Sequence, residues 1–368
     1  MKTTKTAGAQ ASLRAYELAT PAFFDRSSVG EWKRPVKYAD RFRDALDFAA
    51  RHGVRSAALD GQSGPRIALL PIDSQLTFCH PDFELYVGGR SGSGAIDDAA
   101  RLCDFIYRNL GVITSIHPTM DTHLAYQIFH AGFLVDEAGN SPDPHFPTLV
   151  AREEILAGKW KVNPKAAYAV TGNPASYAAL QAHLVHYAES LAQGGKYALT
   201  IWPFHAMLGG LGHALVPAIE EAIFFHAIAR GAQVDFQIKG GNPLTENYSV
   251  LRPEVLTTVG GKPLSNAQKN TKFLKALLDN DAVVIAGQAK SHCVAWTIED
   301  LLGEILSQDP ELVKKVYLLD DCTSSVVVPG IVDFTQQGDD AFRRFAAAGM
   351  HVVSSTTPIE DWPGIKLG

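Results

Sequence analysis

Cysteine is scarce in this sequence, and its few residues are too scattered to form a cysteine motif. Cys79, Cys103, Cys293 and Cys322 are the only four among 368 residues, and no two of them have CxxC spacing. A disulfide framework and a thiolate zinc site both need clustered cysteines. The sequence therefore indicates neither, and we expect a protein of a reducing, cytoplasmic compartment.

Long apolar runs and an excess of basic residues are also missing. No stretch reaches the roughly 18 apolar residues of a membrane span, and the N-terminal MKTTKTAGAQASLRAYEL lacks a signal-peptide core. Lys and Arg number 33 against 39 Asp and Glu, which gives a formal net charge of −6. Nucleic acids and anionic membranes are usually bound by basic surfaces. We therefore expect binding of small molecules, and no binding of nucleic acid or membrane.

What the sequence does contain is an alternation of strand-like and helix-like segments. The composition, 46% hydrophobic and 20% charged, is that of a globular chain. Apolar runs typical of strands lie at 66–73, 110–116, 196–202, 232–238, 281–287, 314–321 and 350–355. Helical periodicity occurs at 38–53, 95–110, 212–231, 270–280 and 293–306. Repeated βα units of this kind predict an α/β fold, a doubly wound and mostly parallel sheet with helices on both faces.

The rhythm of this alternation suggests how the chain is organised. Residues 1–62 hold a polar start and one helical segment that ends at Gly53, and we interpret them as an N-terminal extension. Residues 63–368 would form the main domain. Within it, residues 137–195 are rich in Pro, Gly and Asn and interrupt the βα pattern, so we interpret them as an insertion.

Side chains able to do chemistry follow several of the predicted strands. These residues are Asp73, Asp121, His123, His205, Lys239 and Cys293. Each has an ordinary alternative role, as a cap, a solvated strand end, a hydrogen-bonded histidine or a packed thiol. The carboxyl ends of parallel strands meet at one edge of a sheet, where sites are usually found. Their convergence at that edge is therefore more informative than any one of them.

Cys293 lies between the strand-like DAVVIAG and the amphipathic helix pattern CVAWTIEDLLGEIL. In or just before the first turn of a helix, unpaired N–H groups and the helix dipole stabilise a thiolate. Free cysteines are also among the most buried residues and often only fill space. This segment alone leaves a nucleophile and a core thiol both open.

Three segments together resemble the isochorismatase-like cysteine hydrolases, and within them the nicotinamidases. The segments are PIDSQLTF, FQIKGGNPLTENYSVL and AGQAKSHCVAWT, within a resemblance that spans roughly 66–357 apart from the insertion. It implies a three-layer fold and a triad of Asp73, Lys239 and Cys293. It further implies a cis peptide between Gln288 and Ala289 that directs N–H groups at an oxyanion.

A metal site is implied by the same resemblance. MDTH and WPFH are similar to the Asp-x-His and Trp-Pro-x-His of nicotinamidases, and they supply Asp121, His123 and His205. One carboxylate and two imidazoles suit a divalent metal, zinc first, with manganese or iron as alternatives. His130 could be a further ligand or a hydrogen-bonded residue. Thr122 departs from the tryptophan of the family pattern, which leaves the substrate open.

The function implied is that of a metal-assisted amide hydrolase that forms a thioester and releases ammonia. Its partner would be a small-molecule amide, and we expect a homo-oligomer. Three alternatives remain: a metal-free amide or carbamoyl hydrolase, an isochorismatase-type hydrolase, and a catalytically silent binding or assembly module. Of the neighbouring residues, His292 would pack among aromatic rings or line a rim, and Glu246 would support the turn at Tyr248 or orient Lys239.

Overall fold

The computed structural model describes residues 16–367, and its centre is a parallel sheet. The sheet has five strands in the order β13-β10-β9-β1-β2, and every neighbouring pair is parallel. The strands are β1 (Ile67–Ile72), β2 (Ser115–Ile116), β9 (Ala282–Gly287), β10 (Val316–Leu319) and β13 (His351–Val353). The predicted fold class, a doubly wound and mostly parallel α/β sheet, is confirmed.

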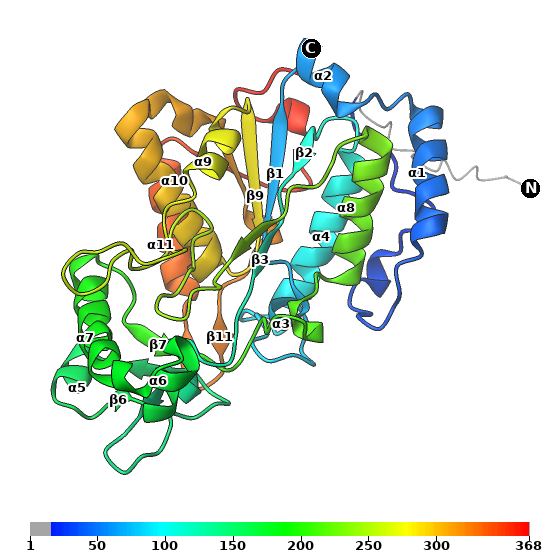
Figure 1. Ribbon diagram of the computed structural model, residues 1–368. Helices are drawn as coiled ribbons and strands as arrows, with labels where there is room; N and C mark the ends of the chain where they lie inside the picture. The colour runs from blue at the N-terminus through cyan, green and yellow to red at the C-terminus, as the bar shows by residue number, and fades with distance from the viewer. Residues whose placement is uncertain (1–15, 368) are drawn as a thin grey trace, which may run out of the picture.

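Helices cover both faces of this sheet because its central strands are apolar on both sides (Figure 1). One face carries α4 (Gly94–Arg108) and α8 (Pro217–Arg230), and the other carries α9 (Thr271–Leu278), α10 (Ala295–Gln308) and α11 (Thr335–Ala347). Each face has its own core of buried apolar side chains. The two cores make three layers, as the sequence resemblance implied.

A further helix lies outside α8. Helix α1 (Tyr38–His52) contacts α8 and buries Ala45 and Phe48 in the core on that face. It ends where the sequence predicts, at Gly53, whose φ of 64° is the left-handed value that glycine adopts without strain. The N-terminal segment that contains α1 is therefore packed onto the main fold (Figure 1).

A short parallel pair brings the end of one strand opposite the end of another. Strand β3 (Thr119–Asp121) pairs with β8 (Gln237–Lys239), in a register that sets Asp121 against Lys239. Asp73 directly follows β1, which lies beside β9. β1 and β9 approach so closely at their ends that a Cβ at Gly287 would lie 2.0 Å from the carbonyl oxygen of Ile72. Only glycine fits there.

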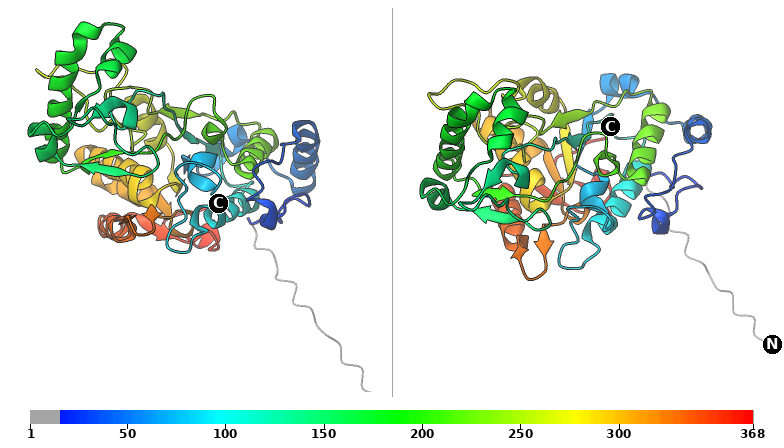
Figure 2. Two further views of the ribbon diagram at one scale, coloured as in Figure 1. Left: turned by 90° about the horizontal axis from the view of Figure 1, so that it is seen from below. Right: turned by 60° about the horizontal axis from the view of Figure 1, so that its bottom comes forward.

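The middle of the chain forms a separate lobe, at the lower left in Figure 1, and Figure 2 shows its helices standing to one side of the sheet. Its elements are η2 (Ala131–Phe133), β4 (Leu134–Val135), β5 (Thr148–Val150), α5 (Arg152–Leu156), β6 (Lys161–Val162), α6 (Pro164–Thr171), η3 (Pro174–Ser176), α7 (Tyr177–Gln193) and β7 (Leu199–Ile201). They share a core of their own. The remaining elements are η1 (Arg26–Ser28), α2 (Ala57–Ser63), α3 (Leu76–Cys79), η4 (Leu211–His213), the π-helical turn η5 (Lys290–Val294), η6 (Pro310–Lys315), η7 (Asp320–Cys322), β11 (Val327–Val328), β12 (Val332–Asp333) and η8 (Ile359–Asp361).

Two predicted strands lie outside the five-stranded sheet. The run 232–238 is strand only from Gln237, where β8 begins, and β8 pairs with β3 in a sheet of two strands. The run 196–202 was expected in the parallel sheet, but β7 pairs antiparallel with β5. The prediction was wrong because an apolar run indicates burial without indicating its partner, and Leu199 and Ile201 are buried in the core of the lobe. No helix within residues 16–367 has the length and apolarity needed to cross a bilayer.

Candidate active site

Three residues predicted to act together meet at the carboxyl edge of the sheet. The Nζ atom of Lys239 lies 2.9 Å from Asp73 Oδ2 and 3.6 Å from Cys293 Sγ. All three side chains are buried. The lysine and aspartate are at ion-pair distance without the alignment of a hydrogen bond. The structure therefore brings a thiol, a carboxyl group and an ammonium group into one contact.

Asp73 is held from two sides by a residue that the sequence did not point to. Its backbone N–H donates to Thr119 Oγ1 over 3.0 Å, and the Thr119 hydroxyl donates back to Asp73 Oδ1. Asp73 has a φ of 43°, in the left-handed region that non-glycine residues seldom adopt. Thr119 thus fixes both the backbone and one carboxyl oxygen of a strained residue.

Burial governs protonation in this trio. It raises the pKa of Cys293 well above its usual value, and Lys239 opposes the rise only in part. It also raises the pKa of Asp73, again against the effect of Lys239. Burial would lower the pKa of Lys239, but Asp121 and Asp73 together raise it well above its usual value. Without substrate, the site thus favours a neutral Cys293 thiol beside a charged Lys239. It does not favour the thiolate that a position at the start of a helix would stabilise.

The loop before Cys293 has the shape implied by the resemblance. The peptide between Gln288 and Ala289 is cis, and Cys293 lies in the π-helical turn that leads into α10. Side-chain contacts fix Gln288: its Nε2 donates to Asp98 Oδ2 over 2.9 Å, and its Oε1 accepts from Ser324 N–H over 3.3 Å. The buried polar groups of this loop are therefore anchored to α4 and to the segment after β10.

Asp121, His123 and His205 form a second cluster beside the first. One ligand atom from each lies within 4.8 Å of the others, and all three residues are buried. Nδ1 of His205 lies 2.8 Å from Pro203 O, and Nδ1 of His123 lies 3.2 Å from Gly240 O. With a metal bound, donation from Nδ1 to these carbonyls would leave both Nε2 atoms to the metal, the arrangement that metal-binding imidazoles usually have.

Asp121 joins the two clusters. Its Oδ2 lies 2.8 Å from His123 Nε2 and 3.6 Å from His205 Nε2, while its Oδ1 accepts from Lys239 Nζ over 3.0 Å. Burial alone would raise the pKa of Asp121, but His123 and Lys239 hold it well below the usual value. A buried carboxylate with two imidazoles whose Nε2 atoms both lie beside it is a donor set that fits a divalent metal.

His130 lies near this cluster without belonging to it. Its ring centre is 5.6 Å from that of His123 and 5.7 Å from that of His205, and its Nδ1 lies 3.1 Å from Leu124 O. Burial, reinforced by the two histidines, lowers its pKa to about 2. Among the described residues, the trio able to hold a metal does not include His130. The geometry favours the hydrogen-bonded role.

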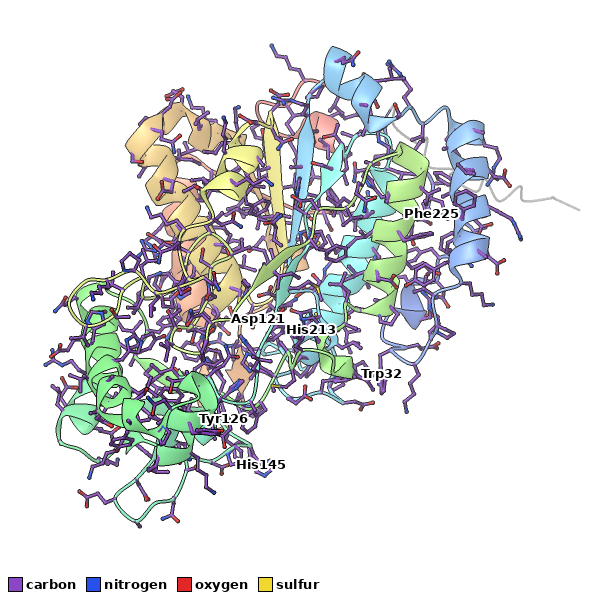
Figure 3. The ribbon with its side chains drawn as sticks, viewed as in Figure 1. Trp32, Asp121, Tyr126, His145, His213 and Phe225 are labelled. Carbon is purple, nitrogen blue, oxygen red and sulfur yellow. The ribbon has the colours of Figure 1, made fainter. Side chains whose placement is uncertain are left out.

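Thr122, the departure from the family pattern, has a specific partner. Its Oγ1 lies 2.9 Å from Nε2 of His213, a residue that sequence reasoning missed. His213 and Asp121 lie close together below the central strands (Figure 3). Thr122 therefore makes a polar contact with His213 next to the cluster of Asp121, His123 and His205.

Both clusters open onto one small cavity. Its lining combines apolar, aromatic and polar side chains: Phe78, Leu85, Val87, Asp121, Trp202, His205, Glu246, Tyr248, Ala289, His292, Cys293 and Val326. The cavity volume is about 30 Å³, so an occupant must be small or must displace lining side chains. Cys293 and two of the three candidate metal ligands thus face the same space.

Glu246 and His292 belong to this lining. Glu246 has one of the two roles that the sequence left open, and His292 packs as the sequence suggested. Glu246 supports its turn by accepting from Asn247 N–H over 2.8 Å, but Lys239 donates instead to the carbonyl of Asn247. Burial, helped by Asp121, raises the pKa of Glu246 to about 8. His292 packs among aromatic rings as expected and in addition lines the cavity.

Comparison with known proteins gives matches among solved structures. No protein-family model matches the chain. No curated protein matches its sequence. It is similar to a nicotinamidase/pyrazinamidase from Acinetobacter baumanii, at 17% identity over 80% of this chain and 98% of that chain, with a TM-score of 0.46. The yeast nicotinamidase is similar at 17% identity over 78% of this chain and 99% of that chain, with a TM-score of 0.46. A pyrazinamidase from Pyrococcus horikoshii in complex with zinc is similar at 17% identity over 79% of this chain and 99% of that chain, with a TM-score of 0.38.

Proposed function

We propose that this chain is a metal-assisted amide hydrolase of the nicotinamidase-like, isochorismatase-like type. The observation that carries the proposal is the position of Lys239. Its ammonium group contacts Asp73, Cys293 and Asp121 at 2.9, 3.6 and 3.0 Å, and so couples a nucleophile and its base to the candidate metal ligands. Lysine in a purely packing role would not need three buried polar partners.

In the proposed reaction, Asp73 acts first as a base and then as an acid. It accepts the Cys293 proton while Sγ attacks the amide carbonyl, and it returns that proton to the nitrogen as the C–N bond breaks and ammonia leaves. Water then attacks the thioester carbonyl and Asp73 accepts its proton. As the C–S bond breaks, Asp73 returns that proton to Sγ, which regenerates the thiol and frees the carboxylic acid. The neutral resting thiol requires such a base, because the thiolate is the reactive form.

Two other groups would support the charge that forms. The backbone N–H groups of Ala289 and Cys293 would receive the oxyanion of the tetrahedral intermediate. Lys239 would remain charged throughout, because two carboxyl groups and the cysteine surround it. It would favour the ionised form of whichever partner, Asp73 or Cys293, has lost the shared proton.

The candidate metal site would serve orientation. Asp121, His123 and His205 would hold the ion, and their mixed N and O donors suit zinc, with manganese and iron as alternatives. When bound, the ion would supply a Lewis-acidic position for a substrate atom or its bound water. Asp121 would meanwhile keep its hydrogen bond from Lys239, so that the two clusters stay in fixed relation.

The test is an ammonia-release assay on pyridine, pyrazine and aliphatic amides, with and without a chelator. We expect turnover of small ring amides, loss of turnover with chelator, and recovery with added zinc or manganese. Cys293→Ala should abolish turnover and keep the fold, because it removes the nucleophile and little volume. Cys103→Ala, at a buried thiol outside the cavity, is the matched control and should stay active.

Each part of the proposal has an outcome that contradicts it. A Cys293→Ala variant near wild-type activity would refute covalent catalysis. Turnover with no bound metal and no chelator effect would leave the metal-free amide hydrolase. No amide hydrolysed at any metal concentration, with Cys293 unreactive toward a mild thiol reagent, would favour the silent binding module.

A further inference from the structure

His292 lines the cavity and has a polar ring atom that no described residue binds. The side chain is 4% exposed and lines the same cavity as Cys293. Its ring lies 4.7 to 5.4 Å, centre to centre, from those of Phe334, Tyr197, Trp202 and Tyr248. Nδ1 lies 2.9 Å from Ser291 Oγ, whereas Nε2 has no hydrogen-bond partner in the part of the chain that the structure describes.

The contacts of Ser291 determine where the His292 proton lies. Ser291 Oγ already accepts from the backbone N–H of Val326 over 3.1 Å. A buried hydroxyl normally donates as well, and His292 Nδ1 is the acceptor within reach. A neutral imidazole that accepts at Nδ1 carries its hydrogen on Nε2. Burial favours that neutral form, since it lowers the pKa of His292 to about 3.

His292 therefore carries an unpaired N–H donor on a ring that lines the cavity and packs against four aromatic neighbours. It is not the base for Cys293, because Lys239 occupies the contact with the thiol and Asp73 is the adjacent carboxyl group. An unpaired donor in a small, largely apolar cavity destabilises the protein unless a ligand satisfies it. The arrangement has the character of a binding group.

We propose that His292 determines substrate specificity by donating its Nε2–H to an acceptor on the substrate. This acceptor is distinct from the reacting carbonyl and from the atom that the metal site would orient. The inference rests on the proposed amide-hydrolase function and narrows its substrates to amides of small flat rings with a second acceptor, such as a second ring nitrogen. A site with a fixed donor discriminates against an analogue that lacks the acceptor, because the donor is then left unpaired.

The test compares amides that differ by one ring atom. Pyridine-3-carboxamide is the parent, and pyrazine-2-, pyrimidine-5- and pyridazine-4-carboxamide each have a further ring nitrogen. The readout is the ratio of kcat/KM for each diazine amide to kcat/KM for the parent, compared across variants so that intrinsic reactivity cancels. His292→Phe should lower this ratio about tenfold for at least one diazine amide. His292→Gln, which keeps an N–H donor at a similar reach, should stay within about twofold of wild type.

Control variants separate donation from packing. Phe334→Leu alters a ring 4.7 Å from His292 that has no donor, and it should change both classes of amide equally. Ser291→Ala removes the hydroxyl that fixes the tautomer and should lower the ratio, which tests the inference should His292→Phe fail to fold. If the kcat/KM ratio stayed unchanged in every folded variant, or fell equally in His292→Phe and His292→Gln, this inference would be wrong. The proposed amide-hydrolase function would still stand. A wild-type protein that hydrolyses none of the amides would overturn the proposed function, and this inference with it.

Discussion

Asp73 is the residue whose surroundings bear most directly on the proposed chemistry. It lies directly after β1 with a positive φ, and it contacts Lys239 at one carboxyl oxygen and Thr119 at the other. Burial and the nearby Asp121 raise its pKa, whereas Lys239 and Thr119 lower it. A carboxyl group balanced in this way can both accept and return a proton.

Replacing Asp73 with Asn should keep substrate binding and lower kcat by roughly 10² to 10⁴, the usual contribution of a positioned acid-base group. In the wild type, kcat/KM should fall as the pH is lowered through the pKa of Asp73, because the ionised carboxylate is the base. That pKa is raised, so the fall should begin above the usual pH 3.8 of an aspartate.

Thr119→Val is the companion variant for this pH profile. Its hydroxyl donates to Asp73 and lowers the pKa of that carboxyl, so its loss should move the acidic limb to higher pH. Steady-state kinetics from pH 4 to 9 would show both effects. If Asp73→Asn kept the wild-type kcat, Asp73 would not be the base. If Thr119→Val left the acidic limb of the kcat/KM profile at the same pH, that limb would not come from Asp73.

At the scale of elements, composition predicted the strands that are buried on both faces. β1, β9 and β10 are continuous apolar runs in the sequence because helices cover them on both sides. β7 was misplaced because an equally apolar run can be buried in a lobe. Burial is a property of one segment, whereas pairing depends on two, and a single sequence shows only the first.

The same distinction explains which site residues could be predicted. Asp73, Lys239 and Cys293 stand at strand ends, where the parallel-sheet rule brings side chains together, and the motifs marked their chemistry. Thr119 and His292 could not be assigned in this way. The role we propose for Thr119 depends on β3 lying beside β1, and the one we propose for His292 depends on its contact with Ser291. Both are contacts of the folded chain.

The end of β8 provides a prediction at this scale. Gly240 follows Lys239 with a φ of 86°, and a Cβ there would lie 2.6 Å from His123 Cε1 and 2.7 Å from Asp121 Oδ1. Gly240→Ala should therefore displace two candidate metal ligands and lower metal affinity by at least about 10- to 100-fold. Elemental analysis of the purified protein and chelator titration would measure this effect.

Gly241→Ala is the matched control for that substitution. A Cβ at Gly241 meets nothing within 4 Å, so metal content and turnover should stay close to wild type. Equal metal content in both variants would contradict the assignment of Asp121 and His123 as ligands. Equal loss in both would instead indicate a general weakening of the segment after β8.

At the scale of the whole molecule, the N-terminal segment that contains α1 is held to the main fold by buried ion pairs as well as by packing. Phe225 lies between α8 and α1 (Figure 3), with its ring centre 5.6 Å from that of Phe48. Glu221 of α8 is 4% exposed, and the guanidinium groups of Arg34 and Arg41 lie 2.6 and 3.1 Å from its carboxyl oxygens. The segment we interpret as an extension thus supplies the counter-charges of a buried acid in the main fold.

The ion pairs of Arg34 and Arg41 with Glu221 predict that the N-terminal segment contributes to the stability of the whole protein. The double variant Arg34→Met, Arg41→Met leaves Glu221 buried without a counter-charge, which typically costs about 3 to 5 kcal/mol of unfolding free energy. Arg43→Met, at a side chain 76% exposed and 3.9 Å from Asp40, should stay within about 0.5 kcal/mol. Adding Glu221→Gln to the double variant should recover part of the loss, because the uncompensated charge is removed. Urea unfolding of the four proteins at pH 7 would measure these differences. A double variant as stable as Arg43→Met would mean that α1 covers the fold without supporting it.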